Sequence, residues 1–95
     1  MIEYGGTDML DVQQAVSHAM QAFSNMVGPK RAAEALLEEV EMVRDNGSAC
    51  WAVTVSEPSH TPALAALSAN LSRDYKVLRI DAETGAFISM RVRKI

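Results

Sequence analysis

The chain has 95 residues, of which 48% are hydrophobic and 22% are charged, and its formal net charge at pH 7 is −3. This length and composition indicate one ordinary globular domain with a single modest core. They exclude a membrane-spanning helix, because no apolar run approaches the roughly 18 residues that a span needs. They also exclude an internal disulfide and a thiolate metal cage, because the chain has one cysteine.

The first residues predict a tail and a cytoplasmic location. Gly5 and Gly6 lose much backbone entropy when ordered, so we expect residues 1–7 to form a flexible tail and residues 8–95 to form a single α+β domain. The start of the chain lacks the basic region followed by an apolar region that marks a secretory signal. We therefore expect the protein to be cytoplasmic.

A first helix is predicted over residues 8–26, with Thr7 or Asp8 as its N-cap. Gly28 and Pro29 end this helix, since glycine suits a C-terminal cap and proline suits the first turn of a following helix. Apolar residues recur along the helix with the spacing of one buried face. This apolar stripe consists of Val12, Ala15, Val16, Ala19, Phe23 and Met26.

The segment after Pro29 has two interpretations. The favoured one is a short helix over residues 29–37 followed by a strand over residues 39–45, and the alternative is a helix that continues to Arg44. The Asn46-Gly47 pair favours the strand, because both residues tolerate the positive φ angles of a two-residue hairpin turn.

Three more strands are predicted, over residues 50–56, residues 75–81 and a last segment that ends near residue 93. Residues 62–71 are expected to form a short helix, with an irregular excursion as the alternative. Gly85 supplies the left-handed residue of the last turn. These elements predict an α+β fold, with N-terminal helices packed on one face of a four-stranded, mostly antiparallel sheet. In the last strand, Ala86, Ile88, Met90 and Val92 are expected to face the helices, and Phe87, Ser89, Arg91 and Arg93 to face water or a partner.

No set of residues has the spacing of a catalytic or metal site. His18 and His60 are far apart in the sequence, and neither belongs to a metal-binding spacing. Cys50 lies between alanine and tryptophan, which indicates a small side chain within a sheet rather than a nucleophile. Glu38 and Glu39 are adjacent, so we expect them to point apart and not to form an acid–base pair. We therefore predict a non-enzymatic protein with no cofactor and no metal.

Charged residues are unevenly distributed along the chain. Acidic residues gather between positions 34 and 45, and most basic residues lie in the last quarter. Two solvated faces that neutralise each other across the sheet explain this pattern, and a basic patch for an acidic partner is the alternative. A nucleic-acid platform is disfavoured by the single aromatic of the last strand and by the negative net charge. The candidate partner-binding residues are Trp51, Phe87, Arg79, Arg91 and Arg93, although Trp51 is also expected to be the largest core residue under the first helix.

An ordered set of short motifs runs through the second half of the chain: Trp51-x-Val53-x-Val55-x-Glu57, Pro62, Tyr75-x-Val77, Asp81-x-x-x-Gly85, and Arg91 with Arg93. This set resembles the gas vesicle accessory protein of the O type, loosely over residues 12–95 and best over 50–93. The resemblance implies a role in gas vesicle assembly. The chain departs from that family in lacking a long charged N-terminal region. It also has His60-Thr61 in place of arginine–isoleucine, and Arg93-Lys94-Ile95 in place of a final arginine–tyrosine.

Residues 77–85, with the sequence Val-Leu-Arg-Ile-Asp-Ala-Glu-Thr-Gly, are also similar to the strand-and-turn signature of the PepSY domain. That resemblance implies a module that regulates or inhibits a peptidase, or that binds another protein. The absence of a signal peptide counts against an exported version. Both resemblances imply a non-enzymatic α+β module.

The leading hypothesis is therefore a cytoplasmic accessory or protein-interaction module, whose partner is another protein of unknown identity, with a homodimer left open. The alternative is a PepSY-like regulatory or peptidase-inhibitory module. A third hypothesis is a small enzyme, or a nucleic-acid-binding or ligand-binding domain. It requires a deep pocket lined by Cys50, His60 or Glu57.

Overall fold

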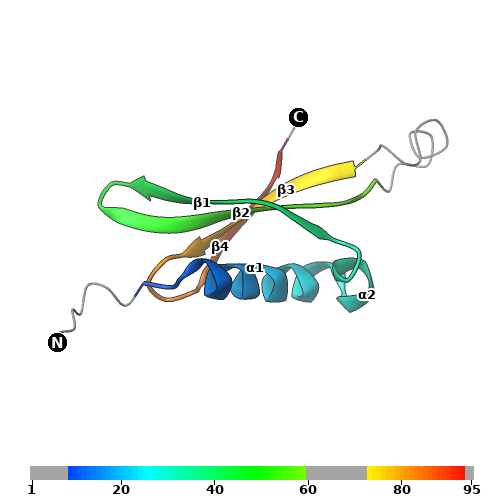
Figure 1. Ribbon diagram of the computed structural model, residues 1–95, viewed down its shortest axis with the longest axis horizontal. Helices are drawn as coiled ribbons and strands as arrows, with labels where there is room; N and C mark the ends of the chain where they lie inside the picture. The colour runs from blue at the N-terminus through cyan, green and yellow to red at the C-terminus, as the bar shows by residue number, and fades with distance from the viewer. Residues whose placement is uncertain (1–8, 60–72, 94–95) are drawn as a thin grey trace.

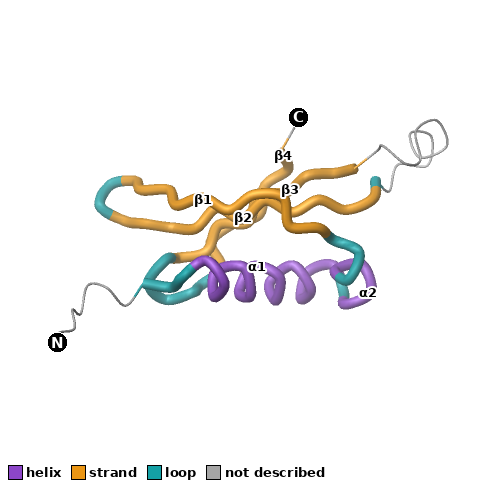
Figure 2. The backbone as a smooth tube through the Cα atoms, in the orientation of Figure 1, coloured by secondary structure: helices purple, strands orange, loops and turns teal. Residues whose placement is uncertain are grey.

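A computed structural model of the chain describes residues 9–59 and 73–93. One long helix lies along a four-stranded sheet and covers one of its two faces (Figures 1 and 2). Within the described residues, no helix is long and apolar enough to cross a membrane. The elements in chain order are α1 (Val12–Val27), α2 (Pro29–Ala32), β1 (Leu36–Asp45), β2 (Ser48–Pro58), β3 (Arg73–Asp81) and β4 (Phe87–Arg93).

The sheet has the strand order β1-β2-β3-β4, and every neighbouring pair is antiparallel. This arrangement confirms the predicted α+β fold. The helical layer differs in detail from the prediction, because α1, with 16 residues, forms nearly all of it and α2 has only four. The sheet face that α1 covers is called the helix face below, and the opposite one the open face.

Helix α1 begins later than predicted, because Asp11 and not Thr7 or Asp8 caps it. The Asp11 carboxylate accepts a hydrogen bond from the Gln14 amide at 2.8 Å, and the Gln14 side chain accepts one from the Asp11 amide at 2.9 Å. This reciprocal capping box satisfies two amides that a helix start leaves free. The Leu10 amide donates to the Ala82 carbonyl at 2.7 Å, so the chain just before the cap is held against the β3–β4 turn.

The segment after α2 is a strand, and the alternative of a helix through Arg44 is wrong. Strand β1 starts at Leu36, which is earlier than predicted, and α2 is correspondingly shorter. Asn46 and Gly47 have φ angles of 51° and 81°, as a two-residue hairpin turn between antiparallel strands requires. Pairing with β2 therefore overrides the helix propensity of the leucines and glutamates in this segment.

The remaining strands contain the predicted ones and are slightly longer. Strand β2 includes the predicted residues 50–56, and β3 includes residues 75–81. The helix expected over residues 62–71 and the tail expected over residues 1–7 both lie outside the described residues.

The core lies between α1 and the two central strands. Phe23 is fully buried, as are Val53 on β2 and Leu78 and Ile80 on β3. Because side chains alternate along a strand, every second residue of β2 and β3 reaches this layer. Trp51 is only partly buried and packs against the edge of this layer, so Phe23, and not Trp51 as expected, is the largest fully buried side chain among the described residues. The apolar stripe of α1 is buried at its centre and about half exposed at its ends, since the sheet twists away from a straight helix.

A β-bulge in β4 changes the predicted faces of two residues. The register pairs Arg79 with Ser89 and Ile80 with Phe87, so Ile88 is the extra residue of the bulge. Phe87 therefore shares the helix face with Ile80, while Ile88 lines a hollow on the open face. The expected alternation is wrong for these two residues, because a bulge shifts the pairing by one position. It holds for Met90, which packs against the core, and for the arginines beyond it.

The β3–β4 turn is fixed by Asp81 and Gly85. The Asp81 carboxylate accepts hydrogen bonds from the amides of Glu83 and Thr84 at 2.8 and 2.9 Å. Gly85 has a φ angle of 79°, and a methyl group added to it would lie 2.7 Å from the His18 ring. His18, predicted to be a surface histidine of the first helix, is exposed and rests against this turn.

Substituting Gly85 by alanine should strain the turn and displace the His18 ring. Gly47→Ala is the matched control, because its φ angle is nearly the same and nothing lies within 4 Å of the new methyl group. Both changes should lower the free energy of unfolding by about 1–2 kcal/mol, the usual cost of left-handed backbone. Only Gly85→Ala should shift the imidazole resonances in NMR spectra, since the exposed ring must turn into solvent. Unchanged resonances would contradict the contact.

The β3–β4 turn should also weaken in acid. The amide hydrogen bonds from Thr84 and Glu83 hold the pKa of the Asp81 carboxyl below its ordinary value of 3.8. The unfolded state therefore binds a proton more readily than the folded state. The stabilisation is complete above the unfolded pKa and is lost as the pH falls through the folded pKa. A carbon-detected NMR titration of Asp81 should give a midpoint below 3.8, and a midpoint at or above that value would contradict the turn. Stability should fall less steeply with acid in Asp81→Asn.

Candidate interaction surface on the open face of the sheet

None of the described helices or strands packs on the open face of the sheet. Helices α1 and α2 both lie on the other side of the sheet (Figure 2). Strand β2 places Cys50, Ala52, Thr54 and Ser56 on the open face, because the alternate residues Val53 and Val55 belong to the core.

Acidic and basic side chains lie at opposite sides of this face. The register gives one row across the four strands, Glu39–Thr54–Val77–Arg91, and a neighbouring row, Glu41–Ala52–Arg79–Ser89. The carboxylates come from β1, and the guanidinium groups come from β3 and β4. The expectation that two separate charged faces neutralise each other across the sheet is therefore wrong in geometry, because both groups share one face.

The middle of the open face is formed by small side chains that lie low between longer ones. Ala52 is 8% exposed and Thr54 is 3% exposed, although neither of the described helices lies over them. The longer charged side chains on either side shield them from water. A groove of about 240 Å³ runs over this floor, between Glu39 and Glu41 on one side and Arg79 and Arg93 on the other. The hollow is shallow and polar, unlike a buried ligand pocket.

An ion pair crosses the sheet at one end of the open face. Nη1 of Arg93 on β4 lies 2.6 Å from Oε1 of Glu39 on β1, and it also donates to the Thr54 hydroxyl at 3.3 Å. The two ionic side chains are 42% and 47% exposed. Pairs this accessible contribute at most about 1 kcal/mol. The contact therefore orients the two edges of the surface more than it stabilises the fold.

Glu38 and Glu39 lie on the same side of the sheet, contrary to the expectation that adjacent residues point apart. A register shift between Leu37 and Glu39 marks a β-bulge, which brings both carboxylates to the same hollow. Glu38 accepts a hydrogen bond from the Ser56 hydroxyl at 2.6 Å, while Glu39 pairs with Arg93. Each carboxylate therefore already accepts a hydrogen bond within the sheet.

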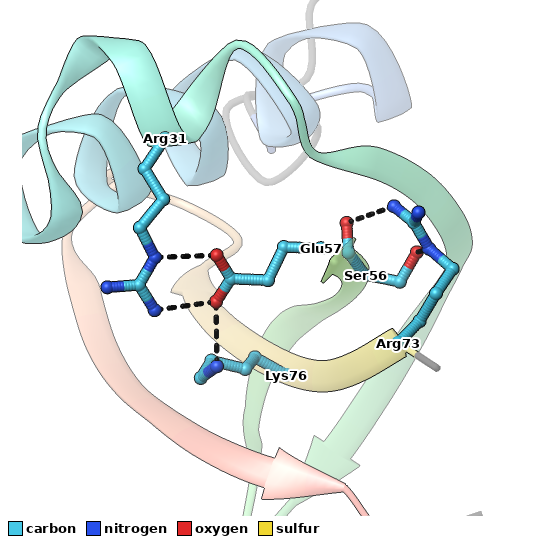
Figure 3. A network of polar contacts seen from close by, with 5 residues as sticks. All are labelled: Arg31, Ser56, Glu57, Arg73 and Lys76. Carbon is cyan, nitrogen blue, oxygen red and sulfur yellow. Dashed lines mark hydrogen bonds and ion pairs between the residues drawn. The ribbon is translucent and has the colours of Figure 1, made fainter. Parts of the chain in front are cut away.

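A buried ionic cluster lies on the helix face near the end of β2 (Figure 3). Glu57 is fully buried, and its carboxylate accepts two hydrogen bonds from Arg31 of α2, at 2.6 and 2.7 Å. Lys76 of β3 donates a third at 2.9 Å. The hydrogen bond to Glu57 raises the pKa of the Arg31 guanidinium, which keeps it charged. This cluster joins α2 to the two central strands.

The Ser56 side chain lies on the open face, whereas that of Glu57 lies on the helix face, because adjacent residues of a strand point to opposite sides of the sheet. Its hydroxyl accepts a hydrogen bond from Nε of Arg73 at 2.8 Å, and its carbonyl accepts one from the same guanidinium at 3.1 Å (Figure 3). Glu57 is one of the residues that the hypothesis of a small enzyme or ligand-binding domain expects to line a deep pocket. It is instead enclosed by cations, so its role in the described structure is to hold elements together.

The structure brings together three of the five candidate partner-binding residues. Arg79, Arg91 and Arg93 share the open face. Trp51 lies on the helix face, where its indole N–H donates to the Leu10 carbonyl at 3.0 Å. Phe87 lies on the helix face at the sheet edge and is 44% exposed.

The acidic side of the open face is absent from the predicted set of partner-binding residues. Glu39 and Glu41 are two residues apart in a segment followed by the Asn46-Gly47 turn. That pattern places them on one face of a strand that pairs with β2. The bulge at Glu38 has no comparable signal in the sequence.

Other candidate chemistry stays dispersed. Cys50 lines a hollow of about 360 Å³ with Arg79, Asp81 and Ile88 at the hairpin end of the open face. His60 lies outside the described residues. Within the described ranges, no three His, Cys, Asp or Glu side chains are grouped so that they could hold a metal ion.

Comparison of the chain with protein-family models, with curated proteins and with solved structures finds no match. The resemblances to the gas vesicle O-type protein and to the PepSY domain therefore stay predictions that rest on short motifs.

Removing the Glu57 charge should destabilise the protein strongly. Glu57→Gln leaves Lys76, whose side chain is only 15% exposed, without its counter-ion. Breaking a buried pair in this way typically costs about 3 kcal/mol or more. Glu39→Gln is the control, since it breaks an exposed pair and should cost less than about 1 kcal/mol. Urea unfolding of both variants measures the difference, and equal costs would contradict the assigned role of Glu57.

Proposed function

We propose that this protein is a non-enzymatic protein-interaction module that binds its partner through the open face of the sheet. The observation that carries the proposal is the charge pattern of the sheet face that α1 and α2 leave open, with carboxylates along β1 and arginines along β3 and β4. Ordered charges of opposite sign on one surface favour a partner with the complementary pattern and fix its orientation.

The shape of the open face favours a protein over a small molecule. Small-molecule sites are mostly apolar cavities that enclose the ligand. The hollow between Glu39, Glu41, Arg79 and Arg93 is a shallow groove with charged sides and a floor of small residues. Such a surface suits contact with another folded surface.

The acidic residues also argue against nucleic acid. Arg79, Arg91 and Arg93 alone would attract phosphates. Glu39 pairs with Arg93 and lies in the same row of the sheet as Arg91, so a phosphate backbone laid across the arginines would approach carboxylates as well. A protein partner can match both signs of charge, whereas a polyanion matches only one.

Assembly of gas vesicles and regulation of a peptidase remain two settings for this interaction. Each is supported only by the motif resemblances described above. Neighbouring genes discriminate between them, since gas vesicle genes favour the first setting and a peptidase gene favours the second.

Affinity capture with an open-face variant tests the proposal. Arg91→Glu reverses one exposed charge of the open face, and Lys30→Glu makes the same change on α2, on the other side of the sheet. We expect the tagged wild type and Lys30→Glu to retain the same protein from the native host. Arg91→Glu should retain at least tenfold less of it, as quantified by mass spectrometry. Equal retention by all three proteins would overturn the use of the open face.

A further inference from the structure

The open face has exposed charges outside the ion pairs of the described structure, as well as a charge pattern. Glu41 and Arg91 are exposed, and neither forms an ion pair with any residue in the part of the chain that the structure describes. Glu39 uses one carboxylate oxygen for Arg93 and remains 47% exposed. Acidic groups on β1 and basic groups on β4 are therefore both available to a facing surface.

The open face also has a size pattern. Strand β2 carries only small side chains on this side, from Cys50 to Ser56, whereas β3 carries Tyr75, Val77 and Arg79. Ala52, which is 8% exposed, lies directly beside Arg79. The surface thus has a low track along β2 next to a raised track along β3.

Both patterns are self-complementary under one symmetry operation. Two identical sheets that face each other can be related by a twofold axis either parallel or perpendicular to the strands. The perpendicular axis places β1 over β1 of the second copy, which sets carboxylates against carboxylates. The parallel axis, running between β2 and β3, places β1 over β4 and the low track over the raised track. Charge and size therefore favour the same axis.

We propose that the partner on the open face is a second copy of this chain, related by a twofold axis parallel to the strands between β2 and β3. This inference rests on the proposed function, because it names the occupant of the same surface. It predicts a two-sheet sandwich with α1 on each outer side.

The register specifies the contacts of this dimer. A parallel axis keeps each residue at its own height along the strands, so Glu39 opposes Arg91 of the second copy and Thr54 opposes Val77. Glu41 opposes Ser89 of the second copy and lies diagonal to its Arg91. The side chains of Glu41 and Arg91 are long enough to contact each other across this diagonal. Packed sheets are about 10 Å apart, which Glu and Arg side chains can span together.

The area of the open face sets the expected affinity of the dimer. Four strands spaced about 4.8 Å apart and about 25 Å long give about 500 Å² per copy. The total of about 1,000 Å² is near the lower limit for specific interfaces. We therefore expect a reversible dimer that forms as the protein concentration rises. The dimer should weaken at high salt, because its charged contacts remain accessible to solvent and dissolved ions screen them.

Sedimentation velocity of the full chain and of two charge-reversal variants tests the dimer. Arg91→Glu and Glu41→Arg each alter a residue without an ion pair in the described structure, so both should fold. Each variant alone sets like charges against each other twice, and its dimer should dissociate at concentrations at least tenfold higher than the wild type. An equimolar mixture of the two variants restores opposite charges between positions 41 and 91 at both contacts, while the substituted position 91 of one copy still faces Glu39 of the other. The mixture should therefore dimerise more tightly than either variant alone. Lys30→Glu is the control and should leave dimerisation unchanged.

Three results would overturn the dimer: a wild type that stays monomeric up to millimolar concentration, variants that dimerise as well as the wild type, or variants that fail to associate when mixed. These failures are distinguishable from failure of the proposed function. A monomeric wild type whose capture of a different protein depends on Arg91 overturns the dimer alone. A monomeric wild type whose capture does not depend on Arg91 overturns both proposals.

Discussion

The structure depends on the packing of one helix against one face of a four-stranded sheet. A helix is about 10 Å across with its side chains, whereas four strands span about 19 Å. Helix α1 therefore covers β2 and β3 well and the outer strands poorly. Phe23 of α1 and the strand residues Val53, Leu78 and Ile80 are fully buried between the helix and the sheet, while Val92 on β4 remains 68% exposed. Because the other face has no helix over it among the described residues, its side chains decide how the protein meets its surroundings.

Two β-bulges at the outer strands shape that open face. One places Glu38 beside Glu39 on β1, and the other turns Ile88 toward the open face on β4. Bulges and charged residues at the edges of a sheet also discourage pairing with the edges of other sheets. The edges of this sheet are therefore poorly suited to strand addition, which leaves the open face as the better surface for contact.

The same chemistry has different effects at the two ionic sites. Glu57 is enclosed by Arg31 and Lys76 under the helical layer, where loss of one partner leaves a buried charge. Glu39 and Arg93 form an ion pair that is exposed to solvent, where dissolved ions screen their attraction. The buried cluster thus holds α2 against the sheet, whereas the exposed pair can rearrange when another surface approaches.

The sequence by itself determined the class of the fold, the order of its elements and the positions of both described hairpin turns. Apolar spacing in α1, alternation in β2 and the Asn46-Gly47 pair are local signals, and local signals survive without knowledge of the rest of the chain. Only the tertiary structure decided where α1 begins, that β1 starts at Leu36 and not at residue 39, and which faces Phe87, Ile88 and Glu38 occupy. Each of these depends on pairing with a distant segment, such as the contact of Leu10 with Ala82 or the register of β3 with β4. The joining of acidic and basic residues on one face is likewise a consequence of strand order, because Glu39 and Arg91 meet in one row only when four strands lie side by side.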